Sequence, residues 1–223
     1  HHANEGLTAL QKFLLQLAAA VAFTVLLRNY GYLTPSLYIP FFNVELAMPW
    51  VVYMIFAAFV MVGTVNAVNI TDGIDGLATG VTMPVMLFFT AVACFWGQLE
   101  LGIFSAGLFG GLCGFLIYNF HPAKVFMGDT GSLFLGGAVC GLAFALDIPL
   151  VLILVGIIYI LETLSDILQV GYFKLTHGKR IFRMAPLHHH LELGGWSEVK
   201  LFCVFSGVTL LACVLAFLGV MGR

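Results

Sequence analysis

The sequence predicts an all-α protein, a polytopic transmembrane helical bundle that forms a single domain over residues 1–223. Hydrophobic residues make up 61% of the chain and charged residues only 9%, whereas soluble domains carry roughly 25% charged residues. The mean hydropathy is +1.04. The apolar residues gather in seven long runs without the alternation of a membrane β-barrel. Helices must therefore satisfy the backbone hydrogen bonds in lipid.

Each apolar run is close to the about 20 residues that a helix needs to cross a bilayer. The sixth run is the longest, and its second half carries Glu162, Asp166 and Gln169 at helical spacing. We expect this polar end to protrude, tilt or line a cavity, with polar pairing inside the bundle as the alternative. In chain order, the expected spans are residues 10–28, 48–66, 77–97, 99–118, 131–147, 148–172 and 199–221.

The positive charges indicate the orientation of the bundle. Alternate threading of the spans puts residues 66–76, 119–130 and 173–198 and the N-terminus on one side. The connection 29–47 and the C-terminus fall on the other side. Because positive residues concentrate on the cytoplasmic side, we expect the first side to be cytoplasmic. It carries seven of the nine Lys and Arg residues, namely Lys12, Lys124, Lys174, Lys179, Arg180, Arg183 and Lys200.

Residues 66–78, NAVNITDGIDGLA, place acids and amides at the end of a predicted helix. Asn69, Asp72 and Asp75 are spaced by three, so consecutive members are neighbours on a helix. An acid at the bilayer centre costs roughly 2.5 to 3.5 kcal/mol, so these side chains should lie at the helix mouth or line a wet cavity. A solvated helix-end turn is the alternative. The scarcity of acids in the chain favours a functional site.

Residues 118–132, YNFHPAKVFMGDTGS, form a second polar connection. Pro122 ends a helix, and the glycine-rich turn 128–132 offers backbone N–H groups that favour phosphate. Asp129 in this turn supplies a hard oxygen ligand of the kind that magnesium prefers. The alternatives are an N-cap role for Asp129 and, for Lys124, a contact to lipid headgroups in place of phosphate.

Residues 185–198, APLHHHLELGGWSE, follow the basic stretch 174–183. The consecutive His188, His189 and His190 cannot share one helical face, and they lack the spacing of a structural zinc site. Imidazoles in a basic loop suit an anionic substrate. The alternatives are a solvated histidine run and, for the basic stretch, a contact to anionic lipid.

The three motifs together resemble the polyprenyl-phosphate N-acetylhexosamine-1-phosphate transferases over essentially the whole chain, and PLHHHLELGGW resembles their muramyl branch. The resemblance implies that the apolar runs are the last seven of ten helices, and that an N-terminal portion with a further Asp-Asp motif is missing. It also implies a Mg²⁺-dependent transfer of phospho-MurNAc-pentapeptide from UDP-MurNAc-pentapeptide to undecaprenyl phosphate. The products would be lipid I and UMP in peptidoglycan synthesis, made at the cytoplasmic face of the bacterial inner membrane.

The resemblance further implies which residues are catalytic. Asp129 would bind Mg²⁺, and Asp72 and Asp75 would belong to the same acidic catalytic cluster, supported by Asn69. His189 would also take part in catalysis. The sequence leaves open whether transfer is a single displacement or passes through a phospho-Asp intermediate, and it does not identify the proton acceptor.

The substrate-binding residues are likewise implied by the resemblance. Phe126 would stack on the uracil, with Asn119 and Gln169 nearby. Lys124 and the histidine run 188–190 would contact the phosphates or the sugar.

Two rival functions stay open at this stage. A sister enzyme that loads GlcNAc-phosphate onto the lipid would share the first two motifs. A proton- or ion-coupled transporter would also contain intramembrane acids, but near the midplane and often within repeats. The sequence leaves the oligomeric state open, a homodimer included, and nucleic acid is not an expected partner.

Overall fold

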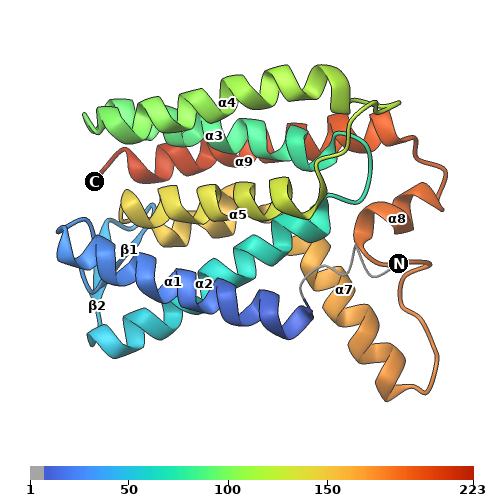
Figure 1. Ribbon diagram of the computed structural model, residues 1–223, viewed down its shortest axis with the longest axis horizontal. Helices are drawn as coiled ribbons and strands as arrows, with labels where there is room; N and C mark the ends of the chain where they lie inside the picture. The colour runs from blue at the N-terminus through green and yellow to red at the C-terminus, as the bar shows by residue number, and fades with distance from the viewer. Residues whose placement is uncertain (1–7) are drawn as a thin grey trace, which may run out of the picture.

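The structure is a computed structural model that describes residues 8–223. It is a bundle of long helices with one small β-hairpin near the N-terminal end of the chain (Figure 1). The elements are α1 (Ala9–Asn29), β1 (Ser36–Ile39), β2 (Val44–Ala47), α2 (Trp50–Thr71), α3 (Leu77–Phe95), α4 (Leu99–Asn119), α5 (Gly128–Ala145), η1 (Pro149–Val151), α6 (Leu152–Val155), α7 (Ile157–Leu175), α8 (Leu187–Glu192) and α9 (Glu198–Val220).

Within residues 8–223, six helices are long and apolar enough to cross a membrane, namely α1 to α5 and α9. The pair formed by residues 149–155 and α7 adds one more if it is counted as a single broken span, which gives up to seven. The prediction of a polytopic helical bundle is thus confirmed. The helix bounds follow the expected runs closely, except that α2 continues past residue 66 to Thr71 and carries Asn69 within its last turn.

Helix α3 forms the centre of the bundle. In its most apolar 18-residue window, 72% of the residues are buried, and it packs against α4, α5 and α9. Helices α2 and α5 also pack closely, because Gly136 lets the two backbones approach. A Cβ added at Gly136 would lie 2.6 Å from the Cα of Val65.

The expected span 148–172 differs most from the structure, because it is broken rather than continuous. Pro149 begins the short helix η1, and α6 ends before Gly156, where the helix axis turns by 79° into α7. Helix α7 therefore leaves the bundle at a steep angle, and the short helix α8 lies beside its first half (Figure 1). The segment bends instead of running as one long straight helix. Glu162 in its polar stripe is buried and pairs with His188, which is the polar pairing expected as the alternative.

A β-hairpin occupies the connection between α1 and α2, where no strand was predicted. Strands β1 and β2 pair antiparallel, with Ser36 opposite Ala47 and Ile39 opposite Val44. The tip of the hairpin is fixed to the end of α9, because the backbone N–H of Phe41 donates to the carbonyl oxygen of Gly219 at 2.9 Å. Strands of four residues are too short for alternation to be recognisable in an apolar sequence.

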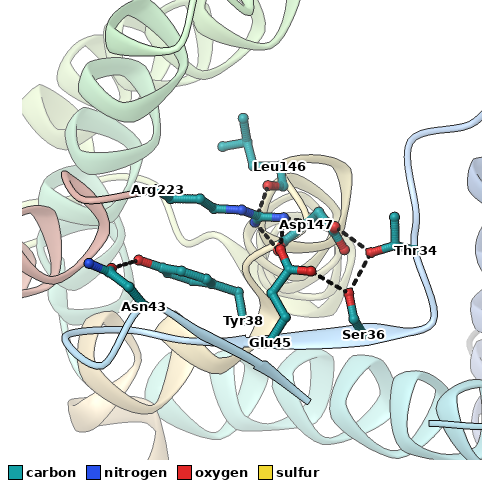
Figure 2. A network of polar contacts seen from close by, with 8 residues as sticks. All are labelled: Thr34, Ser36, Tyr38, Asn43, Glu45, Leu146, Asp147 and Arg223. Atoms are coloured by element: carbon teal, nitrogen blue, oxygen red, sulfur yellow. Dashed lines mark hydrogen bonds and ion pairs between the residues drawn. The ribbon is translucent and has the colours of Figure 1, made fainter. Parts of the chain in front are cut away.

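A polar network closes this end of the bundle (Figure 2). Arg223 Nη2 lies 2.9 Å from Asp147 Oδ2, and the hydroxyl of Thr34 donates to the same carboxylate oxygen at 2.8 Å. The network joins the α1–α2 connection, the turn after α5 and the C-terminus. Alternate threading of the spans also puts the α1–α2 connection and the C-terminus together on one side. The polar motifs lie at the opposite end of the bundle.

Candidate functional site

Asp129 lies where α1, α2 and α5 meet. Its Oδ1 accepts a hydrogen bond from Asn69 Nδ2 at 3.1 Å, and its Oδ2 pairs with the ammonium group of Lys12. Asn69 Nδ2 also donates to Ser132 Oγ at 2.8 Å. Helix α5 begins at Gly128 with Met127 in the N-cap position, so Asp129 sits in the first turn and is not the N-cap. Its side chain is 59% exposed and open to a ligand.

Asp72 follows the last residue of α2 and lies close to Asp129. Burial, together with the negative charge of Asp129, raises the pKa of Asp72 to about 6, although a hydrogen bond from the backbone N–H of Gly128 opposes this shift. The two carboxyl groups therefore differ in character. Asp129 is exposed and paired with a cation, whereas Asp72 is more buried and holds its proton more strongly.

The groups around Asp129 fit a hard divalent cation. Carboxylate oxygens of Asp72 and Asp129 and the hydroxyl oxygen of Ser132 are donor types that Mg²⁺ prefers. Asn69 donates from its amide nitrogen to both Asp129 and Ser132, so it holds these oxygen atoms in place. The assignment of Mg²⁺ to Asp129 stays a prediction.

Asp75 has a different set of partners from Asp72. Its Oδ2 accepts from the backbone N–H of Ala123 at 2.9 Å and lies 3.1 Å from His121 Nδ1. Glu198 Oε2 lies 3.3 Å from the same imidazole nitrogen and accepts from the Asp75 N–H at 3.1 Å. These contacts join the turn after α2, the loop after α4 and the start of α9.

The trio of Asp75, His121 and Glu198 is close enough to hold a metal, since one ligand atom from each lies within 4.8 Å of the others. However, one imidazole N–H shared between two carboxylates already accounts for the arrangement. An imidazole ligand also suits Mg²⁺ poorly. We interpret this trio as a clamp that fixes three segments rather than as the magnesium site.

The loop 120–127 presents Phe126 at the surface, where 75% of the side chain is exposed. Lys124 in the same loop is also exposed. Asn119, in contrast, is only 3% exposed. It accepts from Thr79 Oγ1 at 2.7 Å and donates to the carbonyl oxygen of Val125 at 3.0 Å. The structure thus places Phe126 and Lys124 where a ligand can reach them, and Asn119 beneath them.

Gln169 fixes the basic segment to α7. Its Oε1 accepts from the backbone N–H groups of Ile181 and Phe182, and its Nε2 donates to the carbonyl oxygen of Phe182, each at 3.0 Å. All three contacts of this side chain are to the backbone of the segment that leads into the histidine run.

The three consecutive histidines occupy three different environments. His188 is fully buried, with Nδ1 2.9 Å from Glu162 Oε2. The side chain of His189 is 28% exposed, with Nδ1 2.8 Å from Glu192 Oε2. His190 Nδ1 accepts from the backbone N–H of Arg183 at 3.0 Å. His189 and His190 are both partly exposed. The contact of His189 Nδ1 stays within its own short helix, whereas His188 and His190 contact other segments of the chain.

The profile of glycosyl transferase family 4 matches residues 4–147. A phospho-N-acetylmuramoyl-pentapeptide-transferase of Clostridium acetobutylicum is 52% identical over 98% of this chain and 68% of its own length. Proteins of the same name from Clostridium botulinum and Listeria monocytogenes are 50% and 46% identical, over 98% and 96% of this chain and 66% and 65% of their own lengths.

The chain belongs to glycosyl transferase family 4. Within the family, the high identity over nearly the whole chain puts it among the phospho-N-acetylmuramoyl-pentapeptide-transferases. The chain spans about two thirds of the length of these relatives.

Three residues of this family 4 chain touch the predicted site residues, although none of them was predicted from the sequence to have a role in the site. Lys12 pairs with Asp129, and His121 and Glu198 surround Asp75. His121 stands inside the second motif, directly before Pro122, so its position was a usable signal. Lys12 and Glu198 carried no such signal, because each lies more than 100 positions from its partner in the sequence.

Proposed function

We propose that the protein transfers phospho-MurNAc-pentapeptide from UDP-MurNAc-pentapeptide to undecaprenyl phosphate and so forms lipid I and UMP. The observation that carries the proposal is the meeting of Asp72, Asp129 and Asn69 at one end of a membrane bundle, beside the loop of Phe126. The names of relatives that are 46% to 52% identical support this choice of substrates.

The magnesium requirement of the proposed reaction follows from charge. Both substrates are anionic phosphates, and bound Mg²⁺ would neutralise the pyrophosphate and the charge that develops on it. Asp129 would hold the ion, with the amide nitrogen of Asn69 fixing both its carboxylate and the neighbouring hydroxyl of Ser132. The ammonium group of Lys12 balances the negative charge of this carboxylate, and it competes with a cation for Oδ2.

Asp72 is our candidate for the residue that positions the lipid phosphate or takes its last proton. A phosphate monoester has its second pKa near 6, and burial brings the pKa of Asp72 to about 6 as well. Two groups of matched proton affinity exchange a proton readily near neutral pH. We favour a single displacement, because a lipid phosphate that is already largely dianionic needs little activation.

The remaining predicted residues would bind the sugar nucleotide. The exposed ring of Phe126 would stack on the uracil, and Lys124 would contact a phosphate. His189 and His190 would face the phosphates or the sugar, and Asn119 and Gln169 would hold the two loops that carry these groups. Asp75 would support the turn between Asp72 and α3.

We propose that this end of the bundle faces the cytoplasm of a bacterial inner membrane. The structure groups the connections that carry most of the Lys and Arg residues at the end where Asp129 lies, and positive loops favour the cytoplasmic side. A soluble nucleotide sugar would reach the site from that side.

A substrate competition tests the proposed function. The full-length protein is incubated with undecaprenyl phosphate and Mg²⁺, together with either UDP-MurNAc-pentapeptide or UDP-GlcNAc, and UMP release is followed. We expect turnover of the muramyl substrate. Turnover of UDP-GlcNAc alone would assign the protein to the sister activity, and no UMP release from either substrate would overturn the proposal.

A further inference from the structure

Glu162 and His188 form a buried polar pair beneath the turn that carries Asp72. Both side chains are essentially inaccessible, at 0% and 1% exposure. Glu162 Oε2 lies 2.9 Å from His188 Nδ1 and also accepts from the backbone N–H of His188 at 3.4 Å. The pair joins α7, just after its bend at Gly156, to the first turn of α8.

Glu162 Oε2 is the shared partner of two groups of His188, its backbone N–H and its ring nitrogen Nδ1. An N–H on Nδ1 completes the ring contact to this oxygen. Glu162 Oε1 and His188 Nε2 are also buried, and no hydrogen-bond partner is found for either atom in the described part of the chain.

The far edge of the ring is packed against Gly73. A Cβ added at Gly73 would lie 2.2 Å from His188 Nε2 and 2.6 Å from Cε1. Gly73 is not among the glycines with a positive φ, so its backbone conformation does not require glycine. The close approach of the imidazole is therefore what excludes a side chain at position 73.

We propose that Glu162 and His188 are positioning residues for the turn 72–76: Glu162 fixes the ring of His188, and the ring supports Gly73 and so sets the place of Asp72. Neither residue would touch substrate, so the buried His188 would not make the substrate contact that the family resemblance implies for the histidine run. The inference rests on the proposed function for its kinetic readout only. A displacement of about 1 Å in a reacting group can cost on the order of 100-fold in rate, so the support would matter even without substrate contact.

The first test separates positioning from overall stability. In His188→Asn the side-chain amide can still donate to Glu162, but the contact with Gly73 is lost. We expect kcat for UMP release to fall by about 10- to 100-fold, with KM for the sugar nucleotide changed less than about 3-fold. Glu162→Gln, which keeps an acceptor for Nδ1–H, should retain most of the activity, whereas Glu162→Leu should behave like His188→Asn.

A double-mutant cycle tests the contact with Gly73. Gly73→Ala alone should reduce kcat, but Gly73→Ala combined with His188→Ala should be no worse than His188→Ala, because the ring that the new methyl meets is gone. Gly63→Ala on α2 is the matched control, since no atom lies within 4 Å of a Cβ at that glycine, and it should leave activity unchanged.

Hydrogen–deuterium exchange gives a readout that does not depend on catalysis. The N–H groups of Asp72 and Leu77 donate within the turn region at 3.2 Å each, and we expect their exchange to be about 10-fold faster in His188→Asn while α3 stays protected. Normal kcat and normal exchange in the folded His188→Asn and Glu162→Leu variants would overturn the inference. If the wild-type protein releases no UMP but exchange is still faster in His188→Asn, the inference stands and only the proposed function fails.

Discussion

The side-chain amide of Asn119 donates a hydrogen bond to the carbonyl oxygen of Val125 at 3.0 Å, one residue before Phe126. The hydroxyl of Thr79 on α3 donates to the other end of the same amide at 2.7 Å. A buried amide thus ties the exposed loop to the central helix. Asn119 and Phe126 therefore have separate tasks: one holds the loop, and the other offers a ring to a ligand.

Replacement of Phe126 tests whether its ring binds the base. Stacking of a base on an aromatic side chain contributes about 1 to 3 kcal/mol, so we expect Phe126→Ala to weaken uridine-nucleotide binding about 5- to 150-fold. Phe42→Ala, at the opposite end of the bundle and equally exposed at 76%, is the control and should bind normally. Calorimetric titration with UMP measures both. Unchanged affinity in folded Phe126→Ala would remove this ring from the nucleotide site.

Replacement of Asn119 should affect both stability and binding. Asn119→Ala leaves the buried hydroxyl of Thr79 without its acceptor, and we expect a loss of about 1 to 3 kcal/mol in the free energy of unfolding. Nucleotide affinity should also fall, because the loop no longer holds Phe126 in place. If the effect acts through the ring, the double variant Asn119→Ala with Phe126→Ala binds no more weakly than Phe126→Ala alone. Fully additive losses would mean that Asn119 contacts the nucleotide itself.

The raised pKa of Asp72 predicts a pH-dependent stability. Because the folded state raises the pKa of Asp72 to about 6, the folded protein binds this proton more tightly than the unfolded chain, whose Asp pKa is about 3.9. The contribution of Asp72 to the free energy of unfolding is fully present below about pH 4 and is lost as the pH rises toward 6. Asp72→Asn should therefore be more stable than wild type above pH 6, by roughly 1 to 3 kcal/mol. Melting temperatures between pH 4 and 7, measured with EDTA, decide this, and parallel curves for the two proteins would contradict it.

Hydropathy and charge predicted most of the fold, since each span is a local property of the sequence. The break at Gly156 was missed, because an apolar run looks the same whether it is straight or bent by 79°. The hairpin was missed because its stability comes from distant partners, such as the contact of Phe41 with Gly219 at the end of α9.

The candidate site was also predicted in part, with local features found and tertiary contacts missed. Spacing predicted that Asn69 is a neighbour of Asp72, and the family resemblance added Asp129; the structure brings the three together. Spacing did not predict that Asp72 and Asp75 would have different partners, nor that His188 would be buried while His189 stays accessible. Those differences depend on the direction in which each side chain points from its turn. Tertiary packing sets this direction, and the sequence alone does not show it.

His189 is the histidine that we expect to act on substrate. Its partly exposed ring lies 2.8 Å from Glu192 Oε2, within the same short helix, and packs against the ring of His188. We expect His189→Ala to lower turnover about 10- to 100-fold while the melting temperature stays within a few degrees. His177→Ala, in the exposed loop after α7, serves as the control. Full activity of His189→Ala would return the histidine to the role of a solvated surface residue.

Asp129 and Lys12 together test the metal assignment. Asp129→Asn preserves size and one acceptor oxygen but removes the charge that a hard cation requires, so we expect UMP release to fall by about 100-fold or more. Stability should change little, because an exposed pair such as Asp129 with Lys12 contributes only about 0 to 1 kcal/mol.

Lys12→Met addresses the same carboxylate from the opposite direction. If the ammonium group competes with a cation for Asp129 Oδ2, its removal should lower the Mg²⁺ concentration for half-maximal nucleotide binding, whereas Asp129→Asn should raise it or abolish the response. Glu198→Gln, which alters the trio with Asp75 and His121, should leave this Mg²⁺ titration unchanged. The opposite result would be an unchanged Mg²⁺ titration in Asp129→Asn and a shifted one in Glu198→Gln. It would assign the metal to the trio instead of Asp129, because Mg²⁺ binding depends on the charge of the carboxylate that holds the ion.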